Sequence, residues 1–75
     1  MVRELDSLDG IEFGYVLNYY GRTVGNRIHP HNCPHIQRMS VPPRKVWADS
    51  VQELEAWLHG EGADLDPTSP RCEYI

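Results

Sequence analysis

The chain has 75 residues, a formal net charge of −4, 40% hydrophobic residues and 24% charged residues. This balance is typical of one small globular domain, and it excludes a disordered chain and a strongly basic protein that coats nucleic acid. No apolar run reaches the length of a membrane helix, about 20 residues, and residues 1–6 lack the apolar core of a secretory signal. We therefore expect a cytoplasmic protein whose cysteines stay reduced unless they are bound.

The first third of the chain predicts an extension and a hairpin. Residues 1–10 are expected to form an N-terminal extension with a short helical turn that ends in the turn signal Asp9-Gly10. Residues 11–29 are expected to form an antiparallel hairpin, because the strand-like run "IEFGYVLNYY" precedes the glycine-flanked turn "GRTVGN" and a second short strand. Alternation gives the first strand two faces, one with Phe13, Tyr15, Leu17 and Tyr19, the other with Val16 and Tyr20.

The middle of the chain predicts a loop, a strand and a helix. Residues 30–44 form a loop rich in histidine, cysteine and proline, and residues 45–60 form a short strand followed by a helix. Ser50 and Glu53 make an S-x-x-E capping box at the start of that helix. Within this segment, Trp47 on the strand is expected to meet Trp57 on the helix.

Residues 61–75 form a tail without regular period that is expected to return Cys72 to the body of the domain. Together these elements predict a single small α+β domain over residues 1–75, with an antiparallel sheet of about three strands and one helix packed on it. A chain this short has a marginal core, because it buries only about 60% of the surface that its unfolded form exposes. We therefore expect an additional stabilising element such as a metal ion, a disulfide or a partner subunit.

The stretch "IHPHNCPHIQR" carries the most specific chemical pattern, with His29, His31, Cys33 and His35 on alternate positions. Zinc in proteins takes four nitrogen or sulfur ligands in a tetrahedron. His29 and Cys33 are spaced to close around one ion, and Cys72 is the natural third ligand from the far end of the chain. For the fourth ligand we rank His35 above His31, with Glu73, a water or no fourth ligand as the remaining alternatives.

The order of these features resembles a known kind of domain. A strand reading "GYVLN", a turn, a strand ending in His29, then Cys33, "VWADS", a capped helix and Cys72 are similar to small bacterial domains related to the metal-binding module of Ada-type DNA-repair proteins. The resemblance covers residues 12–75 and implies a small zinc fold associated with nucleases and DNA-modifying enzymes. His29, Cys33 and Cys72 match ligand positions, whereas Ile75 stands where that pattern has a second terminal cysteine.

Three alternatives to a metal site remain open at this point. Cys33 and Cys72 can form a disulfide, which is less favoured in the cytosol. Both cysteines can instead be buried small hydrophobic residues, with the histidines on a loop in water. Cys33 can also be a nucleophile with His35 or His29 as its base, although the sequence supplies no orienting third group and no oxyanion site.

Charge is unevenly distributed along the chain. The 11 acidic residues all lie within residues 4–12 and 49–73, so the segment between is cationic and rich in histidine. This pattern predicts either neutralisation of one part by the other or a basic face for phosphate or an acidic partner. The candidate residues for such a face are Tyr20, Arg22, Arg27, Arg44 and Lys45.

Two hypotheses about function follow from these patterns. The first is a non-enzymatic binding module with a structural zinc site, working with nucleic acid or a nucleic-acid-processing protein in nucleic-acid metabolism or defence. The second is a metal-free acidic protein-interaction domain, such as an inhibitor of a DNA-processing enzyme, that uses an anionic side. The residues of that side are Glu53, Glu55, Glu61, Asp64 and Asp66.

Overall fold

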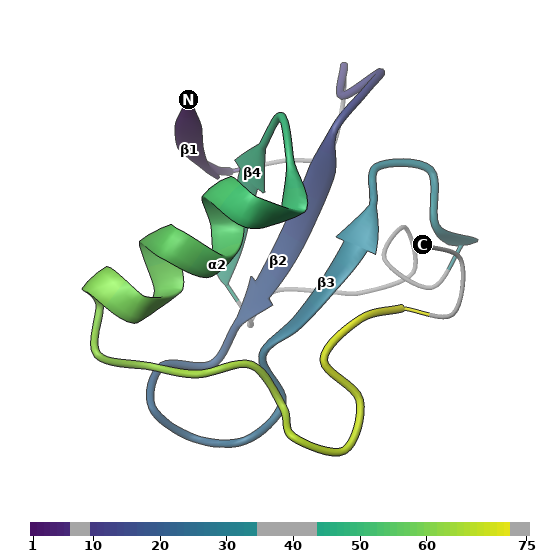
Figure 1. Ribbon diagram of the computed structural model, residues 1–75. Helices are drawn as coiled ribbons and strands as arrows, with labels where there is room; N and C mark the ends of the chain where they lie inside the picture. Colours follow the sequence, from purple (N-terminus) through teal and green to yellow (C-terminus); the bar gives the residue numbers. More distant parts are fainter. Residues whose placement is uncertain (7–9, 35–43, 73–75) are drawn as a thin grey trace.

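The computed structural model describes residues 1–6, 10–34 and 44–72 of the chain. These residues form an antiparallel sheet with one helix packed against it, so the predicted α+β class is confirmed (Figure 1). The elements in chain order are β1 (Val2–Leu5), β2 (Tyr15–Tyr19), β3 (Arg27–Pro30), β4 (Arg44–Ala48) and α2 (Val51–Gly60). The strands lie in the order β1-β4-β2-β3, and each neighbouring pair is antiparallel. The expected hairpin is the β2–β3 pair.

The predicted helical turn near the N-terminus is wrong, because Val2–Leu5 forms the fourth strand of the sheet. This strand pairs with β4, with Val2 opposite Ala48 and Leu5 opposite Lys45. Local sequence does not reveal the pairing, since β1 is stabilised by the otherwise open edge of β4, and the paired residues are 40 to 46 positions apart in the chain. Sheet formation therefore overrides a weak local preference.

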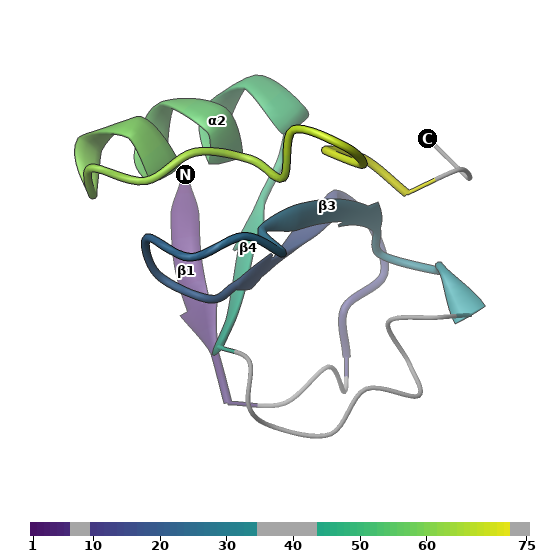
Figure 2. The same ribbon diagram turned by 90° about the horizontal axis from the view of Figure 1, so that it is seen from below.

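The two faces of the sheet carry separate clusters of buried side chains. On the face under α2, the strand residues Leu17, Ile28 and Val46 pack against Leu54 and Leu58 of the helix. Figure 2 shows α2 on this one side of the sheet. The opposite face carries a smaller cluster made of Val16, Cys33, Trp47 and Cys72.

The expected contact between the two tryptophans is wrong. Trp57 packs edge-on against Tyr19 on the helix side, with ring centroids 5.0 Å apart. Trp47 packs edge-on against Phe13 in the other cluster, at 5.3 Å. Neighbouring strand residues point to opposite faces, so Trp47 turns away from the helix because Val46 turns toward it. Phe13 departs from the face predicted for it because Gly14, with a φ of 86°, interrupts the alternation before β2 begins.

The tail returns Cys72 to the body of the domain, as expected, and runs along the free edge of β3 (Figure 1). The Ile28 N–H donates to the carbonyl of Pro70 at 3.1 Å, and the Cys72 N–H donates to the carbonyl of Ile28 at 2.8 Å. Buried Asn26 holds the start of the tail, since its Nδ2 donates to the carbonyl of Asp64 at 2.9 Å. The tail is therefore anchored by backbone hydrogen bonds and a buried amide.

Gly14 is predicted to be far less tolerant of alanine than Gly10, although both have positive φ angles of 86° and 81°. A Cβ on Gly14 would lie 2.6 Å from the carbonyl oxygen of Ala48 and 2.7 Å from Nε1 of Trp47, whereas a Cβ on Gly10 meets nothing within 4 Å. Left-handed backbone costs either alanine about 1–2 kcal/mol. Crowding adds a further cost of about 1–3 kcal/mol for Gly14→Ala alone. Urea unfolding of the two variants measures the difference, and equal losses of stability would contradict this account of the turn.

Candidate metal centre

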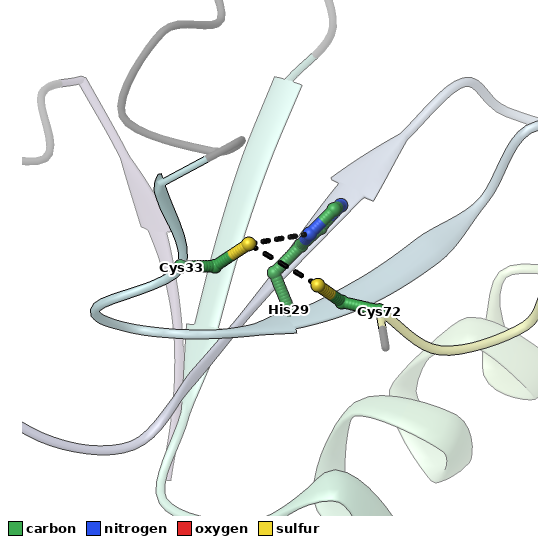
Figure 3. A group of neighbouring side chains, drawn as sticks. All are labelled: His29, Cys33 and Cys72. Carbon is green, nitrogen blue, oxygen red and sulfur yellow. Dashed lines mark hydrogen bonds between the residues drawn. The ribbon is translucent and has the colours of Figure 1, made fainter. Parts of the chain in front are cut away.

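Three side chains with metal-binding atoms converge on the face of the sheet opposite α2. His29 lies on β3, where Ile28 before it turns its side chain toward the helix, so the imidazole points the other way. Cys33 follows the end of β3 in a tight turn that closes with a hydrogen bond from its N–H to the carbonyl of Pro30 at 3.1 Å. Cys72 comes from the tail. Figure 3 shows the three side chains pointing toward one another.

The distances between these ligand atoms suit a metal ion. The Cys33 Sγ lies 3.5 Å from Nδ1 of His29 and 3.1 Å from the Sγ of Cys72. All three ligand atoms lie within 4.8 Å of one another. In a tetrahedral zinc site the bond lengths imply about 3.6 Å between sulfur and nitrogen and about 3.8 Å between two sulfurs. The first separation already matches, and the second requires the two sulfurs to move apart by about 0.7 Å.

The site is buried in an apolar setting. His29 is 2% exposed, Cys33 1% and Cys72 7%, and the cysteines share their cluster with Val16 and Trp47. A hydrophobic shell limits solvent access and strengthens electrostatic bonds to an ion. The alternative that places these histidines in water is wrong for His29. The disulfide alternative is not realised here, because the sulfurs of Cys33 and Cys72 lie 3.1 Å apart and are not bonded to each other.

Asn18 is the residue of this site that sequence reasoning missed. It is 1% exposed and lies on β2, and its Nδ2 is 3.2 Å from Nε2 of His29. The oxygen and nitrogen of an amide are nearly the same size, so a half-turn of the Asn18 amide presents Oδ1 to the same ring atom. In that orientation Nε2 carries the proton and donates it to Oδ1. Nδ1 is then unprotonated, and its lone pair faces the sulfurs. Metal-binding histidines commonly have such a partner on the second nitrogen.

The contact predicts that Asn18→Leu lowers zinc affinity by about 10–100-fold, because the ring then loses the group that fixes its tautomer. Asn18→Asp keeps an acceptor oxygen and should bind zinc within a few-fold of the unmodified protein. Competition with a chelating indicator measures both affinities, and far-UV circular dichroism checks that each variant is folded. Equal affinities for both variants would show that Asn18 does not orient His29.

The sequence predicts His35 as the fourth ligand and ranks His31 after it. His31 is half-buried, and the cluster of His29, Cys33 and Cys72 does not include it. Its N–H donates to the carbonyl of Gly14 at 3.0 Å. His35 and Glu73 lie outside the described residues, and among those described no fourth histidine, cysteine or carboxylate joins the group.

The predicted cationic residues lie at one end of the sheet. Strand register places Arg44 beside Tyr19 and places both Arg27 and Lys45 beside Asn18, while Tyr20 follows the end of β2. Their environments differ, however. Tyr20 is 46% exposed, whereas Lys45 is 4% exposed, and burial lowers the pKa of its ammonium group.

Several of these cations already have anionic partners within the chain. The Arg44 guanidinium donates to both carboxylate oxygens of Glu4, and this pairing lowers the pKa of the Glu4 carboxyl. Arg27 donates from Nε to the carbonyl of Ser69 at 2.9 Å and lies 4.0 Å from the Asp66 carboxylate. Neutralisation of the middle of the chain by its ends is therefore observed at these two pairs.

Arg22 differs from these arginines. It is exposed on the turn between β2 and β3, and it makes no ion pair with any other residue that the structure describes. It also lines a surface groove together with Val24 and Leu65. Arg22 and Tyr20 are thus exposed members of the predicted set that make no ion pair with the other described residues.

Two residues of the predicted anionic side are engaged as well. Glu53 accepts from the N-terminal ammonium of Met1 at 2.7 Å, and its own N–H donates to Ser50 Oγ at 3.2 Å, as the capping box predicts. Glu55 accepts from Arg71 at 3.0 Å. These carboxylates serve contacts within the fold.

No protein-family model, no curated protein and no solved structure matches the chain. Within the described part of the chain, no helix has both the length and the apolar character needed to span a membrane. The feature of the described residues that bears on function is the site that brings His29, Cys33 and Cys72 close enough to hold a metal ion.

Proposed function

We propose that this chain is a small non-enzymatic binding module whose fold is held by a structural zinc ion on His29, Cys33 and Cys72. The observation that carries the proposal is the convergence of these three buried ligand groups from a strand, a turn and a distant tail. Two thiolates and an imidazole are a donor set that suits zinc. Their positions also match the ligand positions of the Ada-type resemblance.

The position of the site supports a structural role. Cys33 and Cys72 are separated by 39 positions in the chain, so one ion on both would join the tail to the turn after β3. It would do so on the face of the sheet that has the smaller buried cluster. Structural zinc sites are four-coordinate, and we assign the fourth position first to His35.

The burial of the sulfurs argues against the catalytic alternative. His29 lies 3.5 Å from the Cys33 sulfur, which is close enough for a base and a nucleophile. A nucleophile, however, must reach its substrate, and Cys33 is 1% exposed. The arrangement therefore favours a held ion over a reacting thiol.

Metal content tests the zinc part of the proposal. Protein purified without a His-tag should contain about one zinc per chain, and a strong chelator should abolish its cooperative thermal melt. The reason is that structural zinc sites contribute an apparent binding free energy of about 10–16 kcal/mol, as much as the whole stability of a typical domain. His29→Ala, Cys33→Ser and Cys72→Ser should lose the metal and unfold.

The matched control is His31→Ala, which removes a nearby histidine outside the cluster and should keep both metal and stability. Protein that contains no metal and melts identically with and without chelator would contradict the zinc site.

We also propose that the module contacts single-stranded nucleic acid through Tyr20 and Arg22. Tyr20 and Arg22 are both exposed and lie two residues apart in the chain, and an aromatic ring and a guanidinium supply stacking and phosphate contact, the two interactions that such ligands need. The context of nucleic-acid metabolism or defence comes from the Ada-type resemblance. The side chain of Arg44 is 55% exposed at the same end of the sheet. It adds a further phosphate contact when its guanidinium leaves Glu4 and binds a phosphate instead.

Salt dependence tests this second part. Affinity for a fluorescent single-stranded oligonucleotide should fall steeply as salt rises, because phosphate contacts release bound counterions. Arg22→Glu should weaken binding and reduce the salt slope by about 1. Arg3→Glu makes the same change in net charge on β1, where Arg3 lies opposite Trp47 and outside the predicted cationic set, and should leave the slope nearly unchanged. If the oligonucleotide does not bind, or if its affinity does not change with salt concentration, the nucleic-acid part is contradicted. The zinc part is unaffected by that result.

A further inference from the structure

We infer that Cys33 and Cys72 also form a redox site, in which hydrogen peroxide joins the two sulfurs in a disulfide and expels the metal. The inference rests on the proposed zinc site for the metal it releases. The pairing of the two thiols rests on the structure alone. It adds a regulatory property to the site: the metal would be held under reducing conditions and released under oxidising ones.

The position of the two sulfurs carries the inference. Their separation is 3.1 Å, so closing a bond of about 2.05 Å requires a movement of about 1 Å. The backbone sets this proximity, because the N–H groups of Cys33 and Cys72 bond to the carbonyls of Pro30 and Ile28 on either side of His29. In the folded protein, these backbone hydrogen bonds therefore bring the two sulfurs together.

The chemistry balances with peroxide as the only oxidant. The sulfur of Cys72, the more exposed residue of the pair, attacks a peroxide oxygen, the O–O bond breaks, and a sulfenic acid and one water form. The second sulfur, already within reach, attacks the first, the S–O bond breaks, and the oxygen leaves as a second water. Overall, two thiols and one peroxide give one disulfide and two waters. When the thiolates start on zinc, the products are one disulfide, one free Zn²⁺ and two hydroxide ions.

Metal binding and disulfide formation exclude each other. The thiolate is the form that binds metals, and a disulfide no longer contains a thiolate. Both links nevertheless join the same two segments, the turn after β3 and the tail. A disulfide across this long loop restricts the unfolded chain much as the metal does. The oxidised protein should therefore stay folded without metal, whereas the reduced protein without metal should not.

The chain contains a local reporter of the reaction. Trp47 belongs to the same buried cluster as both cysteines, whereas Trp57 packs against Tyr19 on the helix side of the sheet. The sequence has 2 tryptophans, so Trp57→Phe leaves Trp47 as the single fluorescent indole. Its emission should change when the neighbouring sulfurs exchange zinc for a disulfide.

The experiment treats zinc-loaded Trp57→Phe protein with a small excess of hydrogen peroxide. Indicator dye should report one zinc released for each disulfide, intact mass should show the loss of two hydrogen atoms, and peptide mapping should place the bond between Cys33 and Cys72. Trp47 emission should follow zinc release, and far-UV circular dichroism should persist. Dithiothreitol should restore zinc binding. Cys72→Ser is the control in which peroxide can add oxygen but cannot form the intramolecular bond.

The possible failures separate this inference from the proposed function. Zinc that stays bound, or sulfurs that gain oxygen without forming the disulfide, would overturn the redox inference and leave the structural zinc site intact. Protein that binds no zinc at any stage would overturn the proposed function together with the metal-release step. In that case the mass and the peptide map still decide whether the two thiols pair.

Discussion

The pairing of the tail with Ile28 is the interaction on which the candidate metal centre depends. Ile28 donates its N–H to Pro70 and accepts from the N–H of Cys72, so one residue of β3 holds two residues of the tail. Its side chain is fully buried beneath α2. The next residue, His29, therefore points to the opposite face, where Cys72 has just been delivered. Backbone pairing along one strand edge thus builds most of the ligand set.

The distribution of apolar residues explains why this face would need an ion. The helix buries one face of the sheet under Leu54 and Leu58, which is a conventional core for a small α+β domain. The buried cluster on the other face is smaller and includes both cysteines. In a chain of 75 residues, burial alone leaves little margin of stability. A metal shared by a turn and a tail adds a strong long-range connection at this weakly packed face.

Local pattern was sufficient for β2, β3, β4 and α2, and for the three residues that converge at the candidate site. The capping box at Ser50, the hairpin and the spacing of His29 and Cys33 are all short-range signals, and each agrees with the structure. The edge strand β1 was not predictable, because it is stabilised by a partner strand far along the chain. The Asn18 contact was missed for a related reason. The signal was one polar residue within the apolar strand "YVLNY", and its meaning depends on strand register.

Zinc K-edge X-ray absorption on protein loaded with one equivalent of zinc identifies the ligand atoms themselves. An ion on Cys33, Cys72 and His29 should show two sulfur ligands at about 2.3 Å and nitrogen at about 2.0–2.1 Å, as two thiolates and an imidazole require. A first shell made only of nitrogen and oxygen would contradict this ligand set, since the ion would then be bound without Cys33 and Cys72.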